Sequence, residues 1–134
     1  MVVTGLTRVA AVFMMLVALA VAGHFVATPI YDPDVEDTAR TIWDLLNYCM
    51  IAACAFSVIA GFARLRLMHT RTDVKEFIAG NVTFYASAGL LLLLLWNWVS
   101  LNWGNGGDGQ MWVVIDVGLP LVLGSTAVYM FREA

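Results

Sequence analysis

The chain has 134 residues, of which 61% are hydrophobic and only 13% are charged, and its formal net charge is −3 at pH 7. Soluble domains are about a quarter charged, so this composition indicates a membrane protein. The slight acidity argues against a nucleic-acid-binding protein, which needs a basic surface. No linker or low-complexity tract divides the chain, so a single domain is expected.

The first apolar stretch, residues 8–27, is predicted to form a membrane-spanning helix, because about 20 apolar residues cross a ~30 Å hydrocarbon layer. A secretory signal peptide is the competing interpretation. Arg8 precedes the apolar run, and Ala20-Val21-Ala22 resembles a small-residue cleavage site. We expect the segment to be retained as the first helix.

An acidic loop is predicted next, between Thr28 and Arg40, because Pro29 and Pro33 interrupt regular structure. The run resembles the start of a calcium-binding loop, but it lacks the glycine and the glutamate that such loops require at their sixth and twelfth positions. Calcium is therefore not expected. A solvated acidic loop, or a docking surface for a basic partner, is the better interpretation, and its acidic residues are Asp32, Asp34, Glu36 and Asp37.

The second predicted helix, residues 41–63, carries small residues at every fourth position, which lets a neighbouring helix approach closely. They are Cys49, Ala53, Ser57 and Gly61. Cys49 and Cys54 lie five apart, which is not the spacing of a redox CxxC pair, so they are expected to pack as free thiols.

A basic connection leads to the third predicted helix, residues 76–101. The basic residues of this connection could attract anionic lipid. They are Arg64, Arg66, Arg71 and Lys75. The third helix contains the unbroken apolar run Leu90–Leu95, and its other end is rich in tryptophan, as is typical of a membrane interface. A second four-spaced small face is expected to pack against the first, and it comprises Ala79, Thr83 and Ser87.

Four glycines between Trp103 and Gln110 predict a tight turn, and the last predicted helix spans residues 111–131. The expected fold is an all-α integral membrane bundle of four transmembrane helices. Only Arg40 lies at one end of this four-span arrangement, and the other basic side chains gather at the opposite end. By the positive-inside rule, both termini face the cytoplasm, and a bacterial cytoplasmic (inner) membrane is expected. The gathered side chains are Arg8, Arg64, Arg66, Arg71, Lys75 and Arg132.

Asp116 is the foremost candidate for a functional group, because an ionisable residue inside a membrane span is a functional hypothesis by default. Pro120, four residues later, has no N–H for the carbonyl of Asp116, and Gly118 adds further looseness. A local helix kink is therefore predicted here. The alternative interpretation is that Asp116 lies near enough to the interface to be hydrated, or that it accepts one hydrogen bond from a neighbouring helix.

Other polar residues map to the same end of the bundle and could form one pocket with Asp116. They are His24, Asp44, Asn47 and Asn97, and Asn81 is a lesser candidate elsewhere in the third helix. Their spacing matches no metal motif, so no metal is predicted. A bis-histidine haem is also not expected, because His24 and His69 lie at opposite ends.

No phosphate-binding loop, Ser–His–Asp set or HExxH motif is present, so the isolated chain is not expected to be an enzyme. The expected function is a non-catalytic accessory subunit of a larger membrane complex, such as a respiratory or photosynthetic assembly, with bound lipids and no cofactor. The alternative is a small homo-oligomeric transporter or proton/ion conductor that uses Asp116. A metal or quinone site near His24 is a third, weaker possibility.

Overall fold

The described part of the chain forms four long α-helices in a computed structural model that covers residues 2–32, 38–68, 73–104 and 106–133. All four are long and apolar enough to cross a membrane. The expected all-α fold is therefore confirmed, and the four apolar helices indicate a membrane protein. The helices are α1 (Val2–Tyr31), α2 (Thr38–Leu67), α3 (Val74–Trp103) and α4 (Gly109–Glu133).

Each helix extends beyond the apolar stretch from which it was predicted. α1 continues through Pro29 to Tyr31, because a proline in the last turn removes only one backbone hydrogen bond. α2 begins at Thr38, and the carboxylate of Asp32 accepts a hydrogen bond from the N–H of Ala39 at 3.2 Å. At the start of α3, Asp73 is the N-cap residue. The residues that follow an apolar stretch thus prolong its helix.

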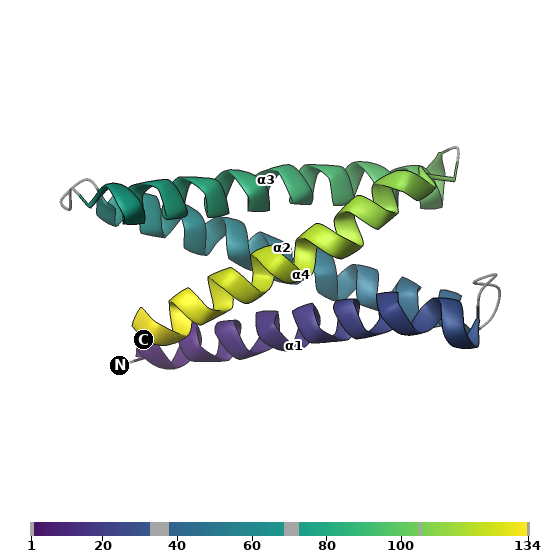
Figure 1. The fold of residues 1–134 in the computed structure, drawn as a ribbon, viewed down its shortest axis with the longest axis horizontal. Coiled ribbons are helices and arrows are strands. Elements are labelled where there is room, and N and C mark those ends of the chain that lie inside the picture. The colour runs from purple at the N-terminus through teal and green to yellow at the C-terminus, as the bar shows by residue number, and fades with distance from the viewer. Residues whose placement is uncertain (1, 33–37, 69–72, 105, 134) are drawn as a thin grey trace.

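Two of the helices are inclined to the other two (Figure 1). α1 and α3 lie on opposite sides, while α2 and α4 pass diagonally between them. α1 packs mainly on α4, and α2 packs mainly on α3. The start of α1, the end of α2, the start of α3 and the end of α4 lie together, and we call this the basic end. The end of α1, the start of α2 and the α3–α4 turn lie at the opposite end, which we call the turn end.

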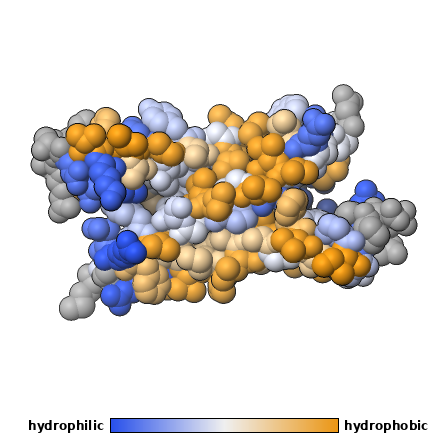
Figure 2. Space-filling model, in the orientation of Figure 1, coloured by the Kyte–Doolittle hydropathy of each residue, from blue (hydrophilic) through white to orange (hydrophobic). Residues whose placement is uncertain are grey.

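Large apolar side chains cover the outside of the bundle between its two hydrophilic ends (Figure 2). Four of them, one on each helix, are 61–69% exposed: Leu16, Ile59, Leu92 and Leu121. A soluble monomer rarely exposes so much contiguous apolar surface. A lipid environment accounts for it, because the hydrocarbon is as apolar as these side chains.

The small-residue face of α2 packs against α3. Ala53, Ser57 and Gly61 are buried, and a Cβ added to Gly61 would lie 3.2 Å from the Cα of Phe84. Ser57 also reaches α4, because its hydroxyl lies 2.9 Å from that of Thr126.

One residue of the second predicted small face, Ser87, takes part in the contact between α2 and α3. Ser87 is buried, and its carbonyl accepts a hydrogen bond from the thiol of Cys54 at 3.4 Å. Thr83 is half-buried and bonds back to its own helix, whereas Ala79 is exposed. α3 therefore meets α2 on a face turned away from Ala79. Both cysteines are free thiols.

The α3–α4 turn is fixed by side-chain hydrogen bonds. Asn97 donates from Nδ2 to the carbonyl of Asp108 at 3.0 Å and accepts from the N–H of Asp108 at 2.6 Å. The carboxylate of Asp108 then caps α4 by accepting from the N–H of Gln110 at 2.9 Å. Gly106 and Gly107 have φ of 94° and 77°, which glycine adopts without strain.

α4 is a continuous helix through its proline, so Pro120 does not end it. Gly118 has a separate role in packing. A Cβ at this position would lie 3.3 Å from the side chain of Leu90, so the glycine lets α3 approach closely. The position at which the sequence predicted a locally weakened helix is therefore also a position of close contact between α3 and α4.

Candidate functional site: a polar cavity at the turn end

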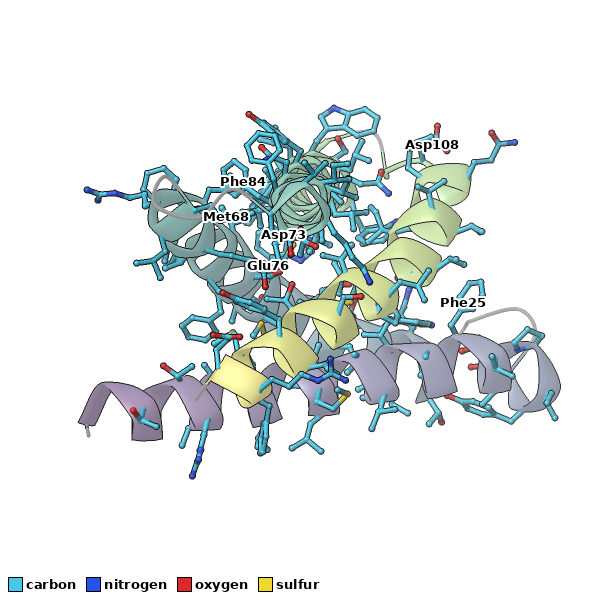
Figure 3. The ribbon with its side chains drawn as sticks, turned by 60° about the vertical axis from the view of Figure 1, so that its left-hand side comes forward. Phe25, Met68, Asp73, Glu76, Phe84 and Asp108 are labelled. Carbon is cyan, nitrogen blue, oxygen red and sulfur yellow. The ribbon has the colours of Figure 1, made fainter. Side chains whose placement is uncertain are left out.

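A cavity of about 480 Å³ opens at the turn end of the bundle. Its size is in the range of small-molecule sites, which run from about 300 to 1,000 Å³. Phe25 extends from α1 toward the first half of α4 (Figure 3). All four helices contribute to the wall, with Phe25, Thr28, Pro29, Arg40, Trp43, Asp44, Asn47, Leu101, Trp112 and Asp116.

Asp116 is the most deeply placed acidic residue of this wall. It is 8% exposed, and its Oδ1 is buried without a hydrogen-bond partner in the described part of the chain. It lies about 10 Å along the helix axis from Gly109, and its backbone carbonyl lacks the usual helical donor because residue 120 is proline. Burying a polar group without a partner is costly, so this carboxyl is poised to accept a hydrogen bond.

Asn47 provides the second buried polar group of the wall. It is 4% exposed, and none of the described residues hydrogen-bonds to its amide. Arg40 and Asp44 lie nearer the mouth and are exposed. The wall therefore contains one cationic and two acidic side chains, and it carries an excess of negative charge when both carboxyls are ionised.

Three pairs of residues spaced by four positions explain how the helices form this wall. Side chains at i and i+4 share one face of a helix. Trp112 precedes Asp116 on α4, and Trp43 precedes Asn47 on α2, so each buried polar group has an indole ring beside it. The third pair, Arg40 and Asp44, lies one turn nearer the mouth. The four-residue spacing of Arg40 and Asp44 is visible in the sequence, whereas the aromatic neighbours Trp43 and Trp112 were not singled out from it, although the repeated spacing was a usable signal.

His24 lies beside the cavity and does not line it. Its ring contacts that of Trp43 with centroids 4.5 Å apart, and its Nε2 hydrogen-bonds to the hydroxyl of Tyr31. Its Nδ1 is buried without a partner among the described residues. His24 thus supports the wall through Trp43.

Two other candidates lie away from the cavity. Asn97 is held by Asp108 in the α3–α4 turn, as described above. Asn81 donates to the carbonyl of Phe77 on its own helix at 2.8 Å. Of the predicted outer cluster, the structure brings together Asp44, Asn47 and Asp116.

Fully buried apolar side chains follow the two buried polar residues of the wall toward the basic end. Leu119 and Leu123 follow Asp116 along α4, and Met50 follows Asn47 along α2; all three are fully buried. They separate Asp116 from the hydroxyl groups of Ser57, Ser87 and Thr126.

No group of three His, Cys, Asp or Glu residues that could hold a metal ion occurs within the described ranges. At the basic end, the guanidinium of Arg64 lies 3.9 Å from the ring centroid of Tyr129, and that of Arg66 lies 5.9 Å from the ring of Phe62. Lys75 is exposed. Arg71 and the acidic residues Asp34, Glu36 and Asp37 lie outside the described residues.

No family model, curated protein or solved structure matches this chain.

Proposed function

We propose that this chain is a non-catalytic subunit of a larger integral membrane complex. In this proposal it lies in a bacterial cytoplasmic membrane with both termini and the basic end in the cytoplasm. The supporting observation is a stripe of exposed residues on α3 that suits contact with another membrane helix. We call it the outer stripe, and it comprises Ile78, Val82, Tyr85, Gly89, Leu92, Trp96, Val99 and Trp103.

The spacing of the outer stripe supports a helical partner. Successive members are separated alternately by four and three residues over the length of α3. This seven-residue repeat is the pattern by which two helices pack side by side. Exposed lipid-facing positions follow a similar period, so the chemistry of the individual members has to distinguish a protein partner from lipid.

Gly89 and Tyr85 are the two residues of the outer stripe that are better suited to contact with a protein than to contact with lipid. A Cβ added to Gly89 would have no neighbour within 4 Å, so this glycine leaves room for another backbone to approach. Tyr85 is 66% exposed, and its hydroxyl has no hydrogen-bond partner in the described part of the chain. Its Cα lies about 17 Å along α3 from Val74, at a depth where lipid tails offer no acceptor.

We therefore propose that the outer stripe contacts a transmembrane helix of another subunit, with a hydrogen-bond acceptor opposite Tyr85. A photoreactive amino acid placed at Leu92 in the native membrane should crosslink to a different membrane protein. The same group at Leu16, which is equally apolar and lies on α1, is the matched control and should yield lipid adducts. Gly89→Leu should abolish the crosslink from position 92.

Two results would count against the proposal. Lipid adducts alone at both positions would leave the outer stripe without a protein partner. A crosslink between two copies of this chain would replace the accessory subunit with a homo-oligomer.

A small homo-oligomeric transporter or proton/ion conductor is the second candidate, and the unpartnered carboxyl of Asp116 is the observation that favours it. The fully buried layer of Leu119, Leu123 and Met50 opposes conduction through one bundle. Conduction would have to pass between copies. Asp116→Asn should abolish flux in proteoliposomes if this candidate is correct, and equal flux in both proteins would dismiss it.

Two further contacts belong to this proposal. The exposed cations of the basic end, such as Arg66 and Lys75, would bind anionic phospholipid headgroups. The acidic loop, from Asp32 to Asp37, would bind a basic segment of a partner subunit.

A further inference from the structure

We propose that the cavity at the turn end binds a primary ammonium group, with the ammonium on the carboxyl of Asp116. The ligand would be a small amine or the headgroup of an aminophospholipid. Neither the helix count nor the proposed role as a subunit requires such a site.

The buried polar groups at the inner end of the cavity can accept hydrogen bonds, so a ligand that fits there should supply donors. Oδ1 of Asp116 is a buried acceptor without a partner among the described residues, and the Asn47 amide beside the same cavity makes no described hydrogen bond. A primary ammonium has three N–H donors and no acceptor, so it can donate to both side chains. A quaternary ammonium has no N–H group and would leave both acceptors unsatisfied.

The charge and the walls of the cavity favour a cation over a neutral donor. Asp44 and Asp116 face a single basic lining residue, Arg40. Trp43, Trp112 and Phe25 supply aromatic rings, and ring faces attract organic cations. A hard metal ion would instead need about six oxygen ligands, which this wall of indole, phenyl and aliphatic groups does not supply.

Arg40 indicates which chemical group the other end of the ligand carries. It is exposed near the mouth, and no ion pair joins it to Asp44 in the part of the chain that the structure describes. A guanidinium recognises phosphate through two parallel hydrogen bonds. A molecule that carries both an ammonium group and a phosphate would offer a partner to Asp116 and to Arg40. The headgroup of phosphatidylethanolamine carries both groups.

The test compares two lipids that differ at the nitrogen atom. The full chain is reconstituted in nanodiscs that contain either phosphatidylethanolamine or phosphatidylcholine, and the lipid retained per protein is counted by native mass spectrometry. Both lipids carry the same phosphate diester, but phosphatidylcholine has no N–H donor. The chain should retain phosphatidylethanolamine, and Asp116→Asn should lower this retention by about tenfold or more. Retention of phosphatidylcholine should be low in both proteins.

Two variants and one competitor complete the experiment. Glu133→Gln, at the basic end, makes the same change in formal charge and should leave retention unchanged. Asn47→Leu should also lower retention, which guards against a folding defect specific to Asp116→Asn; circular dichroism checks the fold of each variant. Free ethanolamine that binds wild-type protein, with no preference between the two lipids, would identify a soluble amine as the ligand.

The proposal would be overturned by equal retention of both lipids together with no Asp116-dependent binding of ethanolamine. Loss of binding in Glu133→Gln to the same extent as in Asp116→Asn would also overturn it, because the effect would then follow net charge. Crosslinking from the outer stripe of α3 is a separate measurement. The subunit proposal can therefore fail while the ammonium site stands, and the reverse also holds.

Discussion

The hydroxyl oxygen of Ser57 lies 2.7 Å from that of Ser87, and both side chains are fully buried in the bundle. The Ser57 hydroxyl also lies 2.9 Å from that of Thr126. Ser87 and Thr126 are each within bonding distance of a carbonyl of their own helix. Three hydroxyl hydrogens thus serve four contacts, so at any moment one of the four contacts is without a hydrogen. Ser57 is the member common to both interhelical contacts.

Replacing Ser57 with alanine should destabilise the bundle by about 1 kcal/mol, because interhelical hydrogen bonds in membranes have about this strength. Ser87→Ala should cost less, since Ser57 can still bond to Thr126. Reversible unfolding in mixed micelles measures both, and the double variant gives the coupling energy. Ser125→Ala is the control, because Ser125 is exposed and bonds only to its own helix at 2.7 Å. A loss in Ser125→Ala equal to that in Ser57→Ala would contradict this account.

Gly61→Leu should separate α2 from α3. The backbone Cα of Phe84 would lie 3.2 Å from the new Cβ, and backbone cannot move aside as a flexible side chain can. We expect a destabilisation of about 1–3 kcal/mol in the same unfolding assay. Gly124→Leu is the matched control, because a Cβ at Gly124 has no neighbour within 4 Å. Equal stability of the two variants would show that the α2–α3 contact is not close at Gly61.

Asn97→Ala should loosen the α3–α4 turn. The change removes both hydrogen bonds to the backbone of Asp108, and the freed groups of that residue lose their partner. The expected cost is about 1–3 kcal/mol, with faster hydrogen exchange at the start of α4. Asn102→Ala serves as the control, because Asn102 is exposed and bonds to its own helix at 2.9 Å. Unchanged exchange in Asn97→Ala would remove this role.

The proposed orientation predicts which end of the bundle a membrane-impermeant maleimide reaches from outside the cell. In a background with Cys49 and Cys54 replaced by alanine, Gly109→Cys at the turn end should react. Lys75→Cys at the basic end should react only after the membrane is opened. Labelling of Lys75→Cys in sealed cells would reverse the proposed topology, while leaving the four-helix fold unaffected.

The four helices could be predicted from the sequence because apolar stretches of this length have few alternatives in a membrane. Their ends could not be predicted as well. The apolar pattern indicates which residues lie in the hydrocarbon layer. The helix itself continues beyond these residues until a capping residue or a turn ends its hydrogen bonding. Pro29 illustrates this, because it lies inside α1 rather than in the loop that its presence predicted.

The candidate site was predicted in part. Counting residues from the helix ends assigns Asp44, Asn47 and Asp116 to one level of the bundle, and the structure places all three along one cavity. Asn97 belongs to the same end but faces the start of α4. The rotation of one helix relative to the next depends on contacts such as Gly118 with Leu90, which a single sequence does not reveal. For the same reason, the aromatic walls at Trp43 and Trp112 became apparent only in the structure.

The most direct test of the proposed role is the mass of the particle that contains this chain when it is extracted from its source membrane into polymer-bound nanodiscs without detergent. The proposal predicts a particle that holds this chain and other membrane polypeptides in a fixed ratio. A particle that contains a single copy of this chain and lipid alone would contradict it.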